Sequence, residues 1–204
     1  LYSDYTTDFG YVEGSLTYGR SDNSTSRIVS VSGVNRSYAA NYNSDNFSFR
    51  LFGGIPFNLG VDFYTTPFIG TTISMIKSDS YEEQSSVTND ALALSYADST
   101  VNSQVGTLGF KFQEIFKGES LTTTAELKLA VNQEFGDDKI TNTNTYQGGG
   151  TSFENTVDIA KTSGTVGLGL DFIYDAIAFS IGYEANIRDQ YLGHSAQAKF
   201  TAKF

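Results

Sequence analysis

Strict alternation of apolar and polar residues over short segments is the feature that most constrains how this chain can fold. The closing stretch from Tyr191 to Phe204, YLGHSAQAKFTAKF, has mostly apolar residues at even positions and mostly polar ones at odd positions. Successive side chains of a β-strand point to opposite faces. The stretch therefore predicts a strand with one apolar and one polar face.

Seven further segments alternate in the same way, and a helical period fits none of them as well. They are residues 11–18, 47–55, 63–76, 107–112, 121–134, 165–172 and 176–188. Together with the closing stretch they predict an all-β fold of about eight antiparallel strands.

The connections between these segments differ in length in a regular way. Short turns are expected near residues 58–61, 117–120 and 174–176, whereas residues 21–46, 77–90 and 136–155 form long polar connections rich in serine, asparagine and glycine. We expect the long connections to be flexible loops into which the neighbouring strands extend. Short periplasmic turns and long external loops are typical of a bacterial outer-membrane barrel.

A soluble β-sandwich is the main alternative, because its strands also alternate between apolar and polar residues. Three observations favour a transmembrane β-barrel. Sandwich loops do not sort so cleanly by length, and the chain ends on the last strand itself. In addition, the polar faces carry charges in mid-strand, such as Lys128 and Asp171, which suits a wet interior.

Composition excludes several other classes. No run approaches 18 apolar residues, so a transmembrane helix is not expected and a barrel is the other way to span a membrane. There is no cysteine, hence no disulfide framework and no thiolate metal site. A net charge of −10 argues against nucleic acid as a partner. No motif indicates a cofactor.

Catalytic chemistry is not expected either. The single histidine, His194, is adjacent to Ser195, and neighbours on a strand point to opposite faces, so the two cannot act as base and nucleophile. Asp137 and Asp138 are the other candidates, but two carboxylates in a loop are more often a solvated turn. We expect a non-enzymatic protein without a metal site.

Several motifs resemble, in order, the β-domains of autotransporters, which belong to type V secretion systems. They are TPFIGTTISMIKSDSYEEQ at residues 66–84, QEFGDD at 133–138, VGLGLDF at 166–172 and SIGYEANIRDQYLGHSAQAKFTAKF at 180–204. The resemblance implies an outer-membrane barrel of twelve strands, threaded by a helix that joins it to an N-terminal passenger. This chain resembles the last eight of those strands.

The resemblance sets the expected organisation and partners. Residues 1–204 are expected to form one outer-membrane β-barrel domain, shortened at its N-terminus, in a Gram-negative bacterium. It would anchor and export a passenger, and its partners would be outer-membrane lipid and lipopolysaccharide, the barrel-assembly machinery, periplasmic chaperones and its own passenger. The alternative is a complete eight-stranded OmpA-type barrel with adhesive or structural surface loops.

Two groups of residues are predicted to carry function. The closing strand resembles the signal that the assembly machinery recognises, with Phe200, Ala202 and Phe204 at alternate positions. The charges on the polar faces are predicted to face the lumen, where they would hydrate it, pair with one another and form a polar wall for an unfolded chain. They are Arg50, Lys111, Glu126, Lys128, Asp171, Glu184, Arg188, Lys199 and Lys203.

Overall fold

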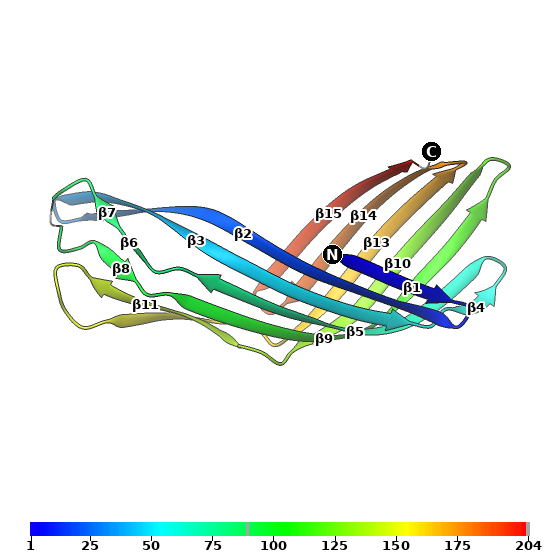
Figure 1. Ribbon diagram of the computed structural model, residues 1–204, viewed down its shortest axis with the longest axis horizontal. Coiled ribbons are helices and arrows are strands. Elements are labelled where there is room, and N and C mark those ends of the chain that lie inside the picture. The colour runs from blue at the N-terminus through cyan, green and yellow to red at the C-terminus, as the bar shows by residue number, and fades with distance from the viewer. Residues whose placement is uncertain (89, 203–204) are drawn as a thin grey trace.

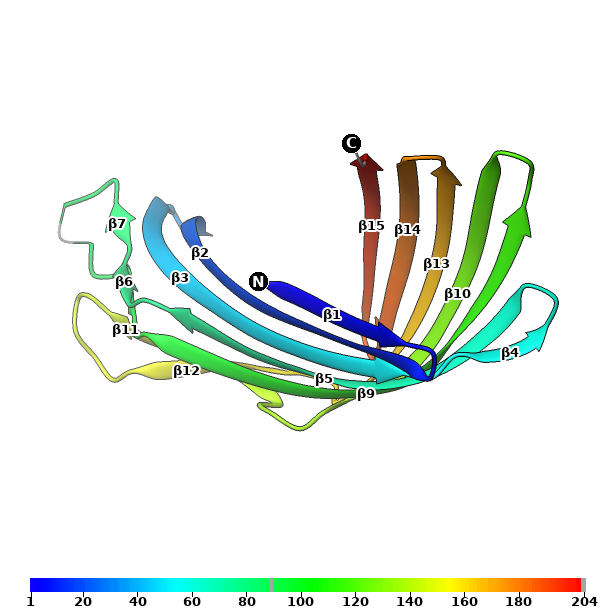
Figure 2. The same ribbon diagram turned by 45° about the vertical axis from the view of Figure 1, so that its right-hand side comes forward.

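A computed structural model, which describes residues 1–88 and 90–202, consists of one strongly curved antiparallel sheet and a small second sheet (Figures 1 and 2). The large sheet runs in the order β1 (Tyr2–Thr7), β2 (Gly10–Val31), β3 (Val34–Gly54), β5 (Phe63–Ser78), β9 (Ser99–Lys117), β10 (Leu121–Glu134), β13 (Thr162–Tyr174), β14 (Ile177–Arg188) and β15 (Tyr191–Ala202). Two short strands flank it: β4 (Phe57–Gly60) pairs with β5, and β7 (Gln84–Ser85) pairs with β3.

The fold class predicted from the alternation is confirmed. Each described pair of neighbouring strands, from β1–β2 to β14–β15, is antiparallel. In the described residues we find no helix with the length and apolar character needed to cross a membrane. The sheet curls into a half-barrel whose two outermost strands are β1 and β15.

All eight predicted strands are present, and the described chain adds β1 at one edge of the large sheet, besides the short strands β4 and β7 and the four strands of the second sheet. Alternation does not predict β1, because its apolar residues do not alternate with polar ones over more than a few positions. Short turns lie at residues 8–9, 61–62, 118–120 and 175–176, so the first predicted turn is displaced by the small strand β4. Asp62 and Asp175 adopt positive φ values of 60° and 49°, which are the conformations that such tight turns require.

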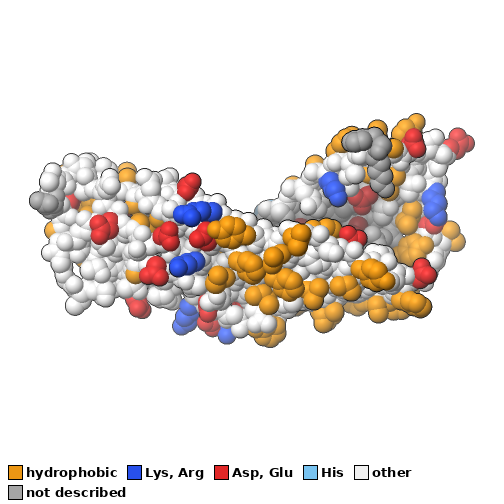
Figure 3. Space-filling model, viewed as in Figure 1, with side chains coloured by type: hydrophobic (Ala, Val, Ile, Leu, Met, Phe, Trp, Pro, Cys, Tyr) orange, Lys and Arg blue, Asp and Glu red, His pale blue; other side chains and the backbone are white. Residues whose placement is uncertain are grey.

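Strand register divides the sheet into two faces of different chemistry. Directly opposed residues of an antiparallel pair share a face, so each register can be followed across the sheet. The convex face carries exposed apolar side chains over segments of about nine to eleven residues, the length needed to cross a bilayer. Figure 3 shows these side chains as a hydrophobic band over β2, β3, β5 and β9 that ends well before the far end of those strands.

Beyond the band, β2 and β3 continue without interruption into an arm. From Gly19 to Val31, β2 extends roughly 40 Å past the band at the usual rise per residue. A second sheet packs there, in the order β12 (Phe153–Asp158), β11 (Lys139–Tyr146), β8 (Leu94–Tyr96), β6 (Tyr81–Glu82). Its strand β6 contacts β3, and its strand β11 contacts β9. The predicted extension of strands into residues 21–46 is confirmed, because β2 and β3 run through them. The prediction that residues 77–90 and 136–155 are flexible loops is wrong where they form the short strands β6, β7, β11 and β12.

The arm has a small core of its own. Tyr38, Ala40, Ala93, Leu94 and Asn144 are buried between its two layers. The rings of Tyr42, Tyr81 and Tyr96 form a continuous stack, with 4.4 Å between successive centroids. Burial and the neighbouring phenol of Tyr96 raise the pKa of Tyr81 to about 12. The arm is therefore a packed element and not a set of independent loops.

Two carboxylates hold the layers of the arm together. Arg27 of β2 donates to both oxygens of Glu83, at 2.8 and 2.5 Å, and the backbone N–H of Leu94 donates to the same carboxylate at 2.9 Å. Asp90 accepts from Ser85 at 2.8 Å and from the hydroxyl of Tyr38 at 3.1 Å.

These contacts lower the pKa values of both carboxyl groups. Burial alone would raise the pKa of Glu83, but the hydrogen bonds from Arg27 and Leu94 outweigh it and hold that pKa below its ordinary value. The hydrogen bond from Ser85 is the main cause that lowers the pKa of Asp90.

We expect the arm to open in acid while the curved sheet persists. Folding lowers the pKa values of Glu83 and Asp90. The two carboxylates therefore stabilise the folded arm fully at pH values above their ordinary pKa values of 4.5 and 3.8. This stabilisation is lost as the pH falls through the lower folded values. Hydrogen exchange should show protection in β8 and β11 falling between pH 5 and 3, about the range that these carboxylates span, with β13 and β14 unchanged as the internal control.

The variant Glu83→Gln separates this ion pair from general acid effects. It should open the arm already at pH 7, because the partly buried guanidinium of Arg27 loses its charged partner, and its further loss in acid should be smaller than in the wild type. Unchanged protection in β8 at pH 7 would show that the pair does not hold the layers together.

Candidate functional site

The concave face of the half-barrel gathers the predicted lumen-facing charges. Register places eight of them on this face: Arg50, Lys111, Glu126, Lys128, Asp171, Glu184, Arg188 and Lys199. Lys203 lies outside the described residues. The shared face follows from the alternation, but its role as the wall of a lumen stays a prediction.

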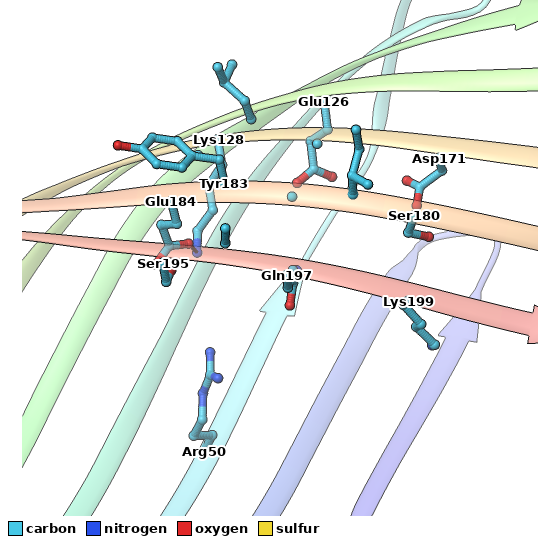
Figure 4. Close-up of a pocket in the computed structure, with 16 residues that line it drawn as sticks. Arg50, Glu126, Lys128, Asp171, Ser180, Tyr183, Glu184, Ser195, Gln197 and Lys199 are labelled. Atoms are coloured by element: carbon cyan, nitrogen blue, oxygen red, sulfur yellow. Dashed lines mark hydrogen bonds and ion pairs between the residues drawn. The ribbon is translucent and has the colours of Figure 1, made fainter.

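A hollow of about 730 Å³ lies on the concave side of β10, β13, β14 and β15, as Figure 4 shows. Arg50 of β3 points into it from the opposite wall. Lys128 and Glu184 form an ion pair of 2.8 Å across the intervening strand, and Gln113 donates to Glu126 at 3.1 Å. Charges on this face are thus partly paired with one another and partly directed into open space.

Glycines leave room for these long side chains. Lys128 and Glu184 both stand opposite Gly167, which has no side chain to separate them. A Cβ added at Gly167 would lie only 3.2 Å from the Cβ of Lys128. The Lys128–Glu184 pair therefore spans β13 because the residue between its members is glycine.

The structure also reveals an aromatic cluster on the concave face that the alternation did not predict. The ring of Phe68 lies over Gly109, the ring of Phe52 over Gly70, and the ring of Tyr11 over Gly54. Phe68 is 3% exposed. An apolar pair at Phe68 and Ile69 breaks the alternation of this segment, and that interruption is the sequence signal for an aromatic ring on the otherwise polar face.

Cationic side chains lie over these rings. The guanidinium of Arg50 is 5.2 Å from the ring centre of Phe52, and the ammonium of Lys111 is 5.1 Å from that of Tyr11 and 5.7 Å from that of Phe68. Cation–π contacts of this kind are favourable. Two of the predicted lumen charges are therefore positioned by aromatic rings and not by carboxylates.

Farther toward the arm, a polar ladder continues the concave face. Asn132 accepts from Thr107 at 2.9 Å and donates to Thr165 at 2.8 Å, and Asn186 donates to Thr165 at 3.2 Å. The ladder links β9, β10, β13 and β14. Its hydrogen bonds make this part of the face a continuous polar surface.

The candidates for catalysis occupy structural positions. His194 lies on the convex face, hydrogen-bonded to the hydroxyl of Tyr183, whereas Ser195 lines the concave hollow. Asp137 accepts from the backbone of Asn102 at 2.7 Å, and Asp138 pairs with Lys161 at 3.0 Å. His194 and Ser195 are thus on opposite faces, as their adjacency predicted.

The predicted assembly residues lie on β15 at one edge of the sheet. Phe200 and Ala202 are on the convex face, where Phe200 is opposite Phe179 and is 66% exposed. Phe204 falls outside the described residues. Within the described chain β15 pairs with β14 alone, so the backbone groups on its other side are open to a partner.

Comparisons with known proteins agree on one class. A family model for the autotransporter β-domain matches residues 1–184. The translocator domain of the autotransporter NalP from Neisseria meningitidis is structurally similar, with a TM-score of 0.69 and 22% identity; the match covers 97% of this chain and 61% of that one. A protein described as outer membrane protein A, from Rickettsia conorii, is 25% identical over 165 residues, which are 80% of this chain and 8% of the relative. The chain thus spans a small part of its curated relative and about three fifths of the solved domain.

The glycine–aromatic contacts predict a contrast between two alanine substitutions. A Cβ at Gly70 would overlap the ring of Phe52, so Gly70→Ala should destabilise the sheet by about 1–3 kcal/mol, a common cost of overpacking. Gly164, also within a strand, has nothing within 4 Å of an added Cβ, so Gly164→Ala should be neutral or mildly stabilising. Urea unfolding in detergent micelles would measure both. Equal stability of the two variants would contradict the close fit of Phe52 over Gly70.

Proposed function

Because this chain belongs to the autotransporter β-domain family and thus to the outer membrane of Gram-negative bacteria, we propose that it anchors and exports an N-terminal passenger. In this proposal residues 1–204 are one domain, and its curved sheet is the part of the translocator wall along which the passenger would pass. We propose no catalytic step for it. The family membership favours this function over that of a complete OmpA-type barrel with adhesive loops.

One observation carries the proposal: the same strands have an exposed apolar convex face and a polar, charged concave face. Leu168 is 58% exposed and its side chain is on the convex side of β13, whereas its neighbours Gly167 and Gly169 stand opposite Lys128 and Glu126 on the concave side. Contact of the apolar convex face with lipid anchors the wall in the membrane. On the other face, paired charges and hydroxyls offer a hydrated surface along which an extended chain meets few apolar contacts.

Assembly through the last strand is the second part of the proposal. The open edge of β15 can add to another sheet through main-chain hydrogen bonds, which lipid cannot supply. Its convex face, with Phe179 and Phe200 side by side, would remain toward lipid during that step. We propose that Phe200, Ala202 and Phe204 are read by the barrel-assembly machinery, after delivery of the chain by periplasmic chaperones.

The assignment of the convex face to lipid can be tested by placing one charged residue on each of the two opposite faces of the sheet. Leu168→Arg should cost roughly 2–4 kcal/mol of stability in the membrane, because it places a charge toward hydrocarbon. Ser180→Arg, on the concave face, should be mild. The measurement is the amount of protease-resistant, heat-modifiable barrel formed by the full-length protein in a bilayer. Equal yields for the two variants would refute the assignment of faces.

Passenger export can be tested without disturbing insertion. Tryptophan at both Ser180 and Ser195 would narrow the concave hollow, so the passenger should reach the cell surface severalfold more slowly while the barrel still inserts. The matched control places tryptophan at the neighbouring convex residues Ile181 and Ala196, and export should be unchanged. Wild-type export by the concave variant would exclude this face as the passenger's route.

The role of the closing strand has its own test. Charged residues in place of Phe200 and Phe204 should reduce insertion far more than deletion of Gly148 to Gly150, which form a turn in the arm. Insertion is again read as heat-modifiable barrel, in cells and in pure lipid vesicles. A defect confined to cells supports recognition by the machinery, whereas an equal defect in vesicles means that the strand serves as wall only.

A further inference from the structure

Strand β12 forms an open edge of the arm's second sheet (Figure 2). Within the described residues β12 pairs with β11 alone, and it contacts no other strand. Its residues from Glu154 to Asp158 are all exposed. An uncovered strand edge of this kind is a template on which another chain can pair.

The backbone groups that β12 offers follow from its hydrogen-bond pattern. The N–H of Ile159 donates to the carbonyl of the opposed Asp138 at 2.8 Å, so these two residues form a hydrogen-bonded pair. In an antiparallel ladder such pairs alternate with pairs whose N–H and C=O groups point away from each other. Every second residue of β12 is therefore bonded to β11. The alternate residues Glu154, Thr156 and Asp158 direct their N–H and C=O groups to the open edge.

The side chains of these three residues lie on the outer face of the second sheet. The other face includes Asn144, which is buried in the core of the arm. Glu154 has no basic side chain within 4.0 Å in the described part of the chain. Asp158 meets Lys139 at 3.7 Å, with both side chains mostly exposed. The edge therefore presents two carboxylates, four residues apart, whose charge is little neutralised.

These charges decide which strands the edge can accept. A second copy of β12, paired antiparallel about Thr156, would place Glu154 opposite Asp158 of the copy, and like charges directly opposite are destabilising. The surroundings are acidic as well, because residues 21–43, 79–98 and 136–160 hold ten acidic and three basic residues. The edge is thus protected against its own copies and attracts basic chains.

We propose that β12 binds an extended cationic polypeptide as an added antiparallel strand, with basic side chains opposite Glu154 and Asp158. Main-chain hydrogen bonds to the edge would hold the segment, and its side chains would supply specificity. Directly opposed residues share a face, so the basic residues would be four positions apart. Val157, on the other face, is 63% exposed and favours an aliphatic residue opposite it.

The side of the membrane follows from the connections. The arm is built from the long connections of the sheet, and in outer-membrane barrels these are extracellular. The polypeptide would therefore come from outside the cell. Its binding requires neither passenger export nor assembly through β15, so this proposal and the proposed function can fail independently.

The test is a titration of three fluorescent nine-residue peptides with the purified full-length protein in neutral detergent, followed by anisotropy. The first is Thr-Val-Lys-Val-Thr-Val-Lys-Val-Thr, which places its lysines opposite Glu154 and Asp158. The second has proline in place of the central threonine, so it keeps the charge but lacks the N–H that would pair with Thr156. It should bind about tenfold more weakly. The third has glutamate in place of both lysines and should show no binding. Equal binding of the first two would overturn the proposal, because the attraction would then be one of charge alone.

A pair of double variants tests the two carboxylates. Glu154→Gln with Asp158→Asn should weaken binding of the first peptide about fivefold, because each exposed cross-strand ion pair contributes modestly. The matched control is Glu119→Gln with Asp175→Asn, which removes the same charge at short turns of the large sheet and should bind like the wild type. Equal weakening by the two double variants, or none by the first, would contradict the proposed site.

A backbone variant tests the edge itself. Thr156→Pro removes an N–H that β11 does not use, so the edge strand should tolerate it, while binding of the first peptide should fall about tenfold. Hydrogen exchange in β11 reports whether the arm of this variant remains folded. In the wild type, the bound peptide should newly protect the N–H groups of Glu154, Thr156 and Asp158. Binding without this protection would overturn the proposal, whatever the behaviour of the proline variant.

Discussion

Every backbone N–H and C=O group inside a bilayer needs a hydrogen-bond partner from the protein, and this requirement governs the whole molecule. The chain meets it within the sheet, with antiparallel ladders that continue from β2 to β15 without a break in the sequence of neighbours, and leaves the outer side of β15 to be paired by a partner. Once the backbone is arranged in this way, side chains alternate between lipid and interior as a matter of geometry. The apolar band and the charged concave face are two consequences of one pairing pattern.

The concave face shows how a curved sheet accommodates large side chains on its inner surface. Curvature brings the inward side chains of neighbouring strands close together, and glycines opposite or beside the largest of them provide the space. Gly109 makes room for the aromatic ring of Phe68. In the same way, Gly167 makes room for the charged side chain of Lys128. The cations Arg50 and Lys111 then lie over rings, so that few of the inner charges depend on an ion pair for their position.

Much of the sheet could be predicted from the sequence, and the arm could not. Alternation assigns a face to Leu168 or Lys128 because the hydrophobic effect separates the two sets of residues sharply. In the distal halves of β2 and β3, serine and asparagine occur on both faces, so alternation carries no signal there. What orders the arm is contacts between distant residues, such as Arg27 with Glu83 and Tyr42 with Tyr81, and these appear only when the chain is folded. The interrupted alternation at Phe68 indicates a ring on the polar face, but its fit over Gly109 is not visible in the sequence, because Gly109 belongs to another strand.

The unbroken passage of β2 and β3 from the band into the arm has a mechanical consequence. The two strands share one hydrogen-bonded ladder from Tyr11 to Val31, with no hinge between the part in the band and the part beyond it. A sideways force on the tip of the arm acts at a distance from the band that is several times the spacing between strands. The hydrogen-bonded ladder of β2 and β3 transmits this force to the wall as a torque. The β2–β3 ladder therefore has no hinge at the border of the band, and a movement of its tip is coupled to the wall even where the layer of β8 and β11 opens.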